Sequence, residues 1–135
     1  MSDLEPIGEH VEDLLRRIGL PRASAATRLV EEWEEGGRRY FHYKAQSPIL
    51  NFYPIMSGRY AVARDTLGAI DVEVYYHPTH GYNVDRMIDS VKKTLDYCSS
   101  QFGPYQFRQV RILEFPRYER FAQSFPNTIP TSEAA

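Results

Sequence analysis

Hydrophobic residues recur with the period of an α-helix over residues 84–102. The apolar positions of this stretch are Val84, Met87, Ile88, Val91, Leu95, Cys98 and Phe102. Asn83 suits the N-cap position, and Gly103-Pro104 is a strong stop for the helix. Cys98 belongs to the apolar stripe, so we expect its thiol to pack in the core rather than to act as a nucleophile. A shorter pattern of the same period over residues 5–18 predicts a second amphipathic helix.

Other segments have the pattern of β-strands. Apolar and polar residues alternate over residues 70–76, which predicts a half-buried strand. Residues 110–115 are apolar on both faces, as in a strand that is covered on both sides. Residues 48–64 are rich in apolar and aromatic residues and are interrupted near Pro54, which predicts one or two strands with a bend. The prolines from Pro116 onwards predict extended chain or loop.

Residues 29–45 fit two structures. Leu29, Val30 and Trp33 among glutamates are compatible with one face of a helix. Gly36-Gly37, followed by an aromatic run, is instead typical of a hairpin turn that leads into a strand. We favour the hairpin, because adjacent glycines adopt positive φ in turns without steric cost and weaken a helix interior.

Composition excludes several classes of function. The chain has 135 residues, of which 42% are hydrophobic and 25% are charged, with a net charge of −2. Such a balance is typical of a soluble globular protein and gives no basic surface for nucleic acid or an anionic membrane. No apolar run approaches the roughly 20 residues of a membrane span, and the acidic start of the chain does not resemble a signal peptide. We therefore expect a soluble, cytoplasmic protein with no membrane segment.

Side chains that could carry chemistry are few. The four histidines include no HExxH pattern, which would place two imidazoles and a general base around one zinc ion. His77 and His80 flank Pro78 at a predicted strand end, and we expect a turn with partly exposed rings rather than a metal site. Glu114 lies in a predicted apolar strand, where a carboxylate needs an ionic partner or solvent. The residues alone indicate an α+β domain without an assigned function.

The second half of the chain resembles a known family. Ile70–Pro78, Tyr97–Tyr105 and Val110–Phe115 are similar to a strand, a helix end and a second strand of the gluzincin zinc aminopeptidases, the aminopeptidase N family. The closest resemblance is to the branch that is fused to bacterial ABC transporter permeases. Ser124–Asn127 falls on the exopeptidase loop of the family, usually written G-x-M-E-N.

The resemblance covers residues 28–134 and implies an α+β fold in two parts. Residues 28–79 would form the end of an N-terminal β-sandwich-like domain, with a hairpin plus strands. Residues 80–135 would form the first helix and strand of a thermolysin-like catalytic domain, with the substrate loop. Residues 1–27 would be an N-terminal helix and connector.

The resemblance also implies a substrate-binding loop. Asn127 matches the Asn of the exopeptidase loop, and Pro126 stands where the family has the Glu that binds the substrate's α-amino group. Glu133 matches a Glu just after the loop, where the branch reads Tyr-Ser-Glu and this chain has Thr131 for the Tyr. The expected substrate-binding residues are therefore Gln123, Ser124, Phe125, Asn127 and Glu133.

In intact members of the family, zinc activates water to hydrolyse a peptide bond. The resemblance implies that this chain stops before the HExxH helix, so we expect no metal ligand, no catalytic residue and no cofactor within it. Peptide substrate would be the partner of an intact relative, whose permease would hold it at a membrane. No nucleic-acid partner is expected.

Three functions remain open from the sequence. The chain is a truncated peptidase relative that is inactive alone, or a small module that binds a peptide or protein by strand addition to an exposed sheet edge. In the third, it is a subunit whose partner chain supplies the zinc site.

Overall fold

The computed structural model describes residues 23–25, 28–45, 48–50, 54–117 and 119–133. The predicted helix over residues 5–18 lies outside these ranges. The chain divides into two compact units, Met1–Arg59 and Tyr60–Ala135. The mixture of one α-helix with several sheets among the described residues confirms the α+β class.

The first unit contains the predicted hairpin. β2 (Arg28–Glu35) pairs antiparallel with β3 (Arg38–Lys44). Gly36 and Gly37 have φ of 58° and 73°, the left-handed values that a two-residue type I′ turn requires. Trp33 and Tyr40 face each other across the ladder, with their rings stacked at 5.1 Å. A separate short pair joins β1 (Ala23–Ala25) to β4 (Ile55–Ser57).

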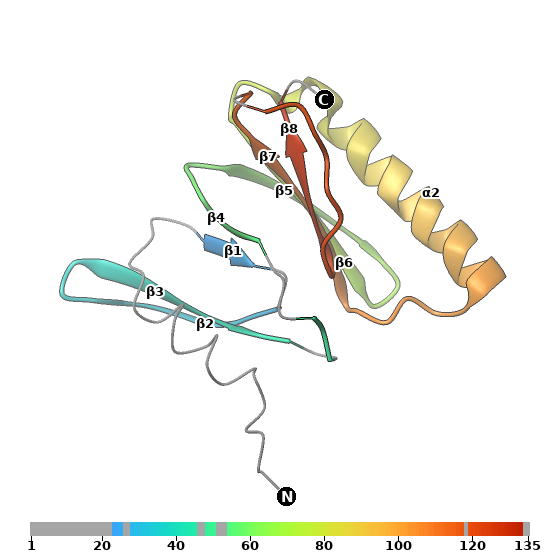
Figure 1. Cartoon of the computed structure of the whole chain (residues 1–135), viewed down its shortest axis with the longest axis horizontal. Helices are drawn as coiled ribbons and strands as arrows, with labels where there is room; N and C mark the ends of the chain where they lie inside the picture. Colours follow the sequence, from blue (N-terminus) through green and yellow to red (C-terminus); the bar gives the residue numbers. More distant parts are fainter. Residues whose placement is uncertain (1–22, 26–27, 46–47, 51–53, 118, 134–135) are drawn as a thin grey trace, which may run out of the picture. The chain divides into compact units, whose positions relative to one another are not determined.

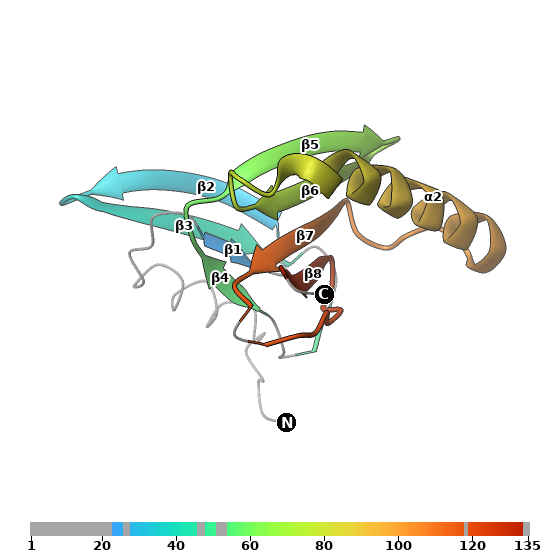
Figure 2. The same cartoon turned by 90° about the horizontal axis from the view of Figure 1, so that it is seen from above.

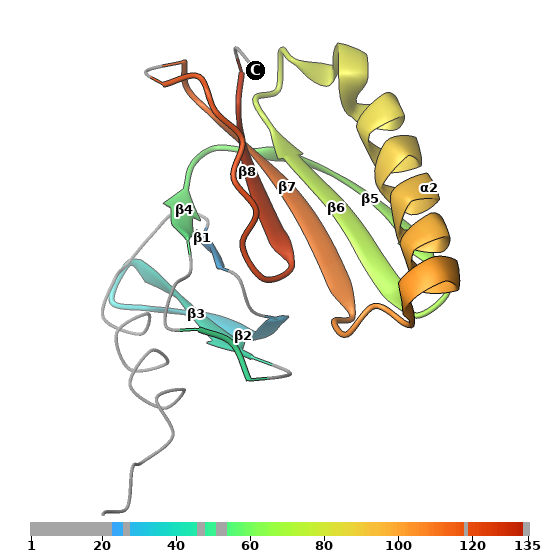
Figure 3. The same cartoon turned by 45° about the vertical axis from the view of Figure 1, so that its right-hand side comes forward.

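The second unit is built on a four-stranded sheet in the order β5-β6-β7-β8 (Figures 1 and 3). Its strands are β5 (Ala61–Leu67), β6 (Ile70–Tyr76), β7 (Gln109–Phe115) and β8 (Thr128–Ser132). A tight turn makes β5 and β6 antiparallel, whereas β6, β7 and β8 are all parallel. Three strands therefore have their carboxyl ends at one edge of the sheet.

Helix α2 (Val84–Phe102) connects β6 to β7, because parallel neighbours need a long crossover. A 3-10 turn (Gly81–Asn83) leads into the helix, which lies on one side of β5 and β6 (Figure 2). The core between helix and sheet is built around Val72, Leu95 and Val110. Asn83 occupies the predicted N-cap position but makes no side-chain capping hydrogen bond.

The predicted burial of Cys98 is wrong. The thiol is exposed, and Phe102, at the end of the same stripe, is 82% exposed. The last turns of the helix extend the apolar pattern beyond the point where Leu95 meets the sheet. Helical spacing determines which residues share a face, whereas the strands opposite determine how far along the helix that face is covered.

The tail after Pro116, for which the prolines predict extended chain or loop, contains the extended strand β8. Pro130 lies within this strand, although proline lacks the N–H of a ladder bond. The carbonyl of Asn127 accepts from the N–H of Arg111 on β7, at 2.9 Å. The carbonyl of Pro130 instead accepts from the N–H of Gln123 at 3.1 Å, and Gln123 lies in the segment before β8 on the side away from β7. The missing N–H of Pro130 is thus turned away from β7, which is why the strand tolerates it.

The compact units divide between Arg59 and Tyr60, whereas the resemblance implies a division between residues 79 and 80, which stays a prediction. β5 and β6 were expected to end the N-terminal part. They instead share one sheet and one core with α2 and β7. The parallel pairing of β6 with β7 joins these strands into one unit. The paired residues lie more than thirty positions apart in the sequence, so local pattern does not indicate the pairing.

The sheet face away from α2 carries a row of charges. Arg64, Glu73 and Arg111 are direct cross-strand neighbours on β5, β6 and β7. The Glu73 carboxylate accepts from Arg64 Nε at 2.9 Å and from Arg111 Nε at 2.7 Å. Burial pushes the pKa of Glu73 upward, but the charges and hydrogen bonds of the two arginines outweigh it and hold the pKa below 4.5. The same row therefore ties three strands together.

Within the described ranges, no helix combines the length and the apolar character that a bilayer crossing demands.

Substituting Leu95 and Cys98 tests the orientation of α2. We expect Leu95→Ala to lower the free energy of unfolding by about 3 kcal/mol, because it leaves a cavity in the core. Cys98→Ala is the matched control on the same helix and should change it by less than about 0.5 kcal/mol. Urea unfolding followed by circular dichroism measures both. A thiol of the native protein that resists Ellman's reagent would contradict the exposed position of Cys98.

Glu73→Gln tests the charged row. We expect a loss of about 2 kcal/mol at pH 7, because the buried Arg111 loses its anionic partner. The folded pKa of Glu73 is depressed, so its contribution is complete above the ordinary value of 4.5 and is lost as pH falls through the lower folded value. The variant should therefore lose less stability than the native chain between pH 5 and 3. The exposed Asp96→Asn is the control, and equal acid sensitivity of E73Q and the native chain would refute the assignment.

Candidate functional site

The carboxyl ends of β6, β7 and β8 bring together two histidines and two glutamates. His77 and His80 follow β6, Glu114 lies near the end of β7, and Glu133 directly follows β8. Ligands of open sheets with parallel strands commonly bind outside the carboxyl ends of the strands. We call His80, Glu114 and Glu133 the strand-end cluster, and it is the candidate site.

A tight turn places His80 in the cluster. The N–H of His80 donates to the carbonyl of His77 at 2.8 Å, with Pro78 at the second position of the turn, where its fixed φ is favourable. His77 Nδ1 lies 2.7 Å from the Thr79 hydroxyl, which holds the first ring within the turn. The two imidazole rings are 5.0 Å apart, and the ring of His80 is directed to the carboxylates. The predicted turn with partly exposed rings is confirmed.

Glu114 is held through both of its oxygens. Oε2 accepts from the backbone N–H of His77 at 2.6 Å, and Oε1 forms a hydrogen bond with Nδ1 of His80. This pair is ionic when the imidazole is protonated. The side chain of Glu114 is only 16% exposed. The expected ionic partner of this strand-end glutamate is therefore His80.

Glu133 approaches the same imidazole from β8. Its backbone N–H donates to the carbonyl of Phe115 at 3.0 Å, which continues the ladder past the last residue of the strand. Oε2 lies 3.9 Å from Nδ1 of His80, and Oε1 accepts from Arg117 Nε at 3.1 Å. The cluster thus has two carboxylates around one imidazole, with one arginine at its rim.

Chemically, the cluster suits a cation. Two neighbouring carboxylates that are partly withdrawn from solvent attract an ammonium group or a metal ion more strongly than fully solvated carboxylates do. The cluster borders a cavity of about 80 Å³, which Tyr76, Tyr82 and Met87 also line. This volume exceeds that of one water molecule.

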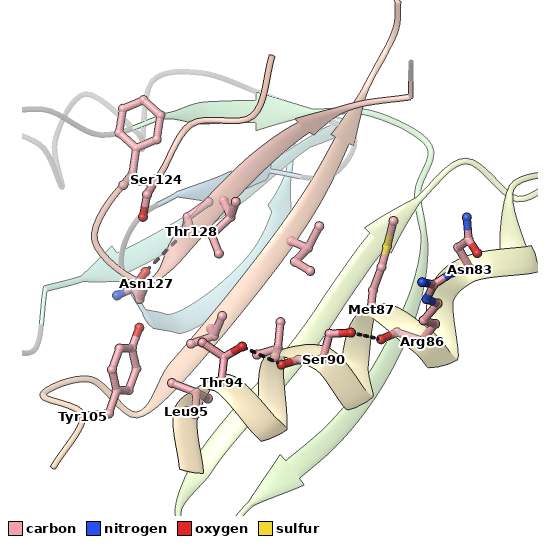
Figure 4. Close-up of a pocket in the computed structure, with 15 residues that line it drawn as sticks. Asn83, Arg86, Met87, Ser90, Thr94, Leu95, Tyr105, Ser124, Asn127 and Thr128 are labelled. Carbon is pink, nitrogen blue, oxygen red and sulfur yellow. Dashed lines mark hydrogen bonds between the residues drawn. The ribbon is translucent and has the colours of Figure 1, made fainter. Parts of the chain in front are cut away.

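A larger groove of about 520 Å³ runs between α2 and strands β7 and β8. Its lining is mainly apolar, with Met87, Val91, Leu95, Val110, Ile112 and Ile129. Figure 4 shows Tyr105 and Asn127 at one end of the groove and Asn83 and Arg86 at the other. Burial raises the pKa of Tyr105 to about 12, so its hydroxyl remains a hydrogen-bond donor at neutral pH.

The groove continues to the strand-end cluster. Asn83, Met87 and Ile112 border both the groove and the small cavity. Alternation along the ladders puts Ile112 and Glu114 of β7 on the same face as Ile129 of β8 and Glu133 beyond it. An extended apolar chain in the groove would therefore reach the carboxylates at one end.

The residues expected from the sequence lie at two places. Ser124, Phe125 and Asn127 line the far end of the groove, whereas Glu133 belongs to the strand-end cluster. The six-residue step from Asn127 to Glu133 follows an extended strand, roughly 20 Å at 3.3 Å per residue. The two ends of the set therefore cannot contact one amino group together.

A hairpin turn places the loop residues. Phe125 and Thr128 exchange backbone hydrogen bonds of 2.8 and 3.2 Å, and Asn127 between them has φ of 51°. Pro126 followed by a residue with positive φ is typical of a type II turn. Gln123 bonds through its N–H to Pro130 and lines neither cavity. Its predicted role, like those of the other loop residues, stays a prediction.

Reasoning from the sequence missed His80 and Glu114 as part of a site. Each was interpreted alone, as a turn residue and as a paired strand residue. The signal was present in the position of both at the ends of apolar strands joined by a helix, which is a parallel arrangement. Only the order β6-β7-β8 makes Glu114 the neighbour of both His80 and Glu133.

The strand-end cluster lacks the zinc-ligand pattern of the resembling family. That zinc needs two histidines one turn apart on a helix with a glutamate as base. Here a single imidazole from a turn meets two carboxylates from strands. No hydrolytic step therefore follows from these residues.

The fold has a counterpart among solved structures. The crystal structure of Legionella pneumophila aminopeptidase A in complex with aspartic acid matches with a TM-score of 0.73 and 16% sequence identity. The match covers 83% of this chain and 14% of that chain, so the chain spans a small part of that enzyme's length. No family model matches the sequence, and no curated protein matches it. The likeness defines an aminopeptidase-like fold.

The turn at Asn127 gives a test of the loop geometry. We compare Asn127→Ala with Asn127→Gly, since both remove the side chain that accepts from the Thr128 hydroxyl. The alanine variant should be less stable by about 1 kcal/mol, because positive φ strains a residue that has a Cβ. Thermal and urea unfolding measure the difference. An alanine variant as stable as the glycine variant would show that the backbone does not adopt this turn.

Proposed function

We propose that this chain is a relative of the gluzincin aminopeptidases that binds peptides through their free amino terminus and does not hydrolyse them by itself. The observation that carries the proposal is the pair of carboxylates, Glu114 and Glu133, at the end of an apolar groove on an aminopeptidase-like fold. Among the functions left open by the sequence, this one uses both the groove and the cluster.

The groove supplies the affinity for apolar side chains. Its floor is made by strands β7 and β8 and its wall by α2, so a peptide of extended conformation would lie along the strands. Ser124, Phe125 and Asn127 would contact its distal part, which keeps the loop residues in a binding role. Apolar pockets with a few well-placed polar groups are typical of ligand sites.

The strand-end cluster supplies the preference for a free amino group. An ammonium group between Glu114 and Glu133 would donate a charge-assisted hydrogen bond to each carboxylate, whereas an acetylated terminus has a single neutral N–H and no positive charge. The backbone N–H of His77, bonded to the other oxygen of Glu114 at 2.6 Å, would keep that carboxylate in place. This places amine recognition on Glu133, beyond the loop, rather than at the position of Pro126.

Hydrolysis needs more than these residues. The sequence contains no HExxH pattern, so the catalytic zinc of the family would require ligands from elsewhere. We also propose that the chain belongs to the permease-linked branch and that its second half begins a thermolysin-like domain. Both statements rest on the motifs in the second half of the sequence.

The proposal is tested with two hydrophobic tripeptide amides that differ only in N-terminal acetylation. Calorimetry in the presence of EDTA should show at least about tenfold tighter binding of the free amine, the effect of losing one charge-assisted hydrogen bond. Glu133→Gln should remove most of this preference. Equal affinity of the native chain for the two peptides would overturn the assignment.

Glu119→Gln is the matched control, since it removes an exposed carboxylate of the segment between β7 and β8. The hydrogen bond of Glu119 with the Ser132 hydroxyl uses the backbone carbonyl, which the substitution keeps. Its preference for the free amine should equal that of the native chain. Release of amino acid from the peptide by the purified chain would contradict the non-hydrolytic part of the proposal.

A further inference from the structure

The strand-end cluster also has the donor set of a transition-metal site. The ligand atoms of His80, Glu114 and Glu133 all lie within 4.8 Å of one another. The side chains are 33%, 16% and 23% exposed, so the cluster is neither a solvated surface patch nor sealed from ions in solution. We propose that these residues bind a divalent transition-metal ion, with zinc as the commonest fit, and that the ion links the ends of β6, β7 and β8.

Each carboxylate is oriented by a second partner. The His77 N–H holds Oε2 of Glu114, which leaves Oε1 directed to the imidazole. Arg117 holds Oε1 of Glu133, which leaves Oε2 directed to the same ring. Outer partners of this kind fix metal ligands and tune their affinity. The cluster therefore presents one oxygen from each glutamate and one nitrogen to a common point.

The spacing allows an ion after a small adjustment. Ligand bonds of about 2.1 Å in a tetrahedral site separate the ligand atoms by roughly 3.4 Å. Glu133 Oε2 is 3.9 Å from Nδ1 of His80, whereas Glu114 Oε1 is in direct hydrogen bond with that nitrogen. The ion would replace the proton of the His80–Glu114 hydrogen bond, as metals do when they bind to protonated ligands. The cavity beside the cluster has room for the water that completes the coordination.

The donor types select the class of metal. Imidazole nitrogen suits zinc, copper, iron and nickel, whereas calcium and magnesium prefer sites made only of oxygen. One nitrogen with two carboxylates therefore favours a transition metal such as zinc over calcium. Three ligands and an open fourth position distinguish the cluster from a closed structural zinc site.

This inference goes beyond the proposed function and does not depend on it. A metal ion and a peptide ammonium group would compete for Glu114 and Glu133, but only the metal uses His80 as a ligand. His80→Ala therefore separates the two, since it removes the nitrogen ligand and keeps both carboxylates.

The experiment uses the full chain without a histidine tag and with Cys98→Ser, which removes the exposed thiol as a competing ligand. Cobalt and zinc are titrated into metal-free protein, with the cobalt spectrum and calorimetry as readouts. We expect one equivalent of metal to bind, and saturating zinc to raise Tm by about 5 °C through mass action. His80→Ala and Glu133→Gln should each weaken metal binding by at least tenfold.

Asp96→Asn, an exposed carboxylate on α2, is the matched control and should bind metal as the parent does. Metal binding that is unchanged in His80→Ala, or no zinc effect on Tm, would overturn the proposal. Calcium that binds as tightly as zinc would also overturn it. An acetylation preference that persists in His80→Ala under EDTA would show that amine binding stands independently. A native chain that binds metal through His80 but has no preference for the free amine under EDTA would refute only the peptide proposal.

Discussion

The parallel ladder from β6 through β7 to β8 is the constraint on which the second unit depends. Parallel strands cannot be joined by a tight turn, so α2 must span the sheet between β6 and β7. The helix then covers one face and buries Val72, Leu95 and Val110. Because all three strands run in one direction, the residues that follow each of them gather at one edge. Core and candidate site thus have a common origin.

The two faces of the sheet have different tasks. On the α2 face, apolar residues pack beside the helix and continue as the floor of an open groove toward β8. On the other face, Glu73 joins Arg64 and Arg111 across three strands. Burial of these charges is tolerated because each carboxylate oxygen of Glu73 has a guanidinium partner. The charged row thus lies on the face opposite the apolar core and the groove.

The likeness to an aminopeptidase concerns the same architecture. A match over 83% of this chain at 16% identity means that the fold is shared while most side chains differ. Function has to be argued from the site, since one fold supports many activities. The site here offers carboxylates and one imidazole at the end of a groove, which is chemistry for holding a cation. The proposed peptide binding and the proposed metal binding both rest on that charge arrangement.

Local pattern alone determined several elements: the helix over Val84–Phe102, the hairpin at Gly36-Gly37 and the strand over residues 70–76. Each depends on contacts between near neighbours, which periodicity and turn chemistry express directly. Only the tertiary structure decided that Cys98 is exposed, that Pro130 lies in a strand, and that Glu114 meets His80 and Glu133. These depend on which strands pair across long sequence separations, and one-dimensional periodicity contains no information about that pairing.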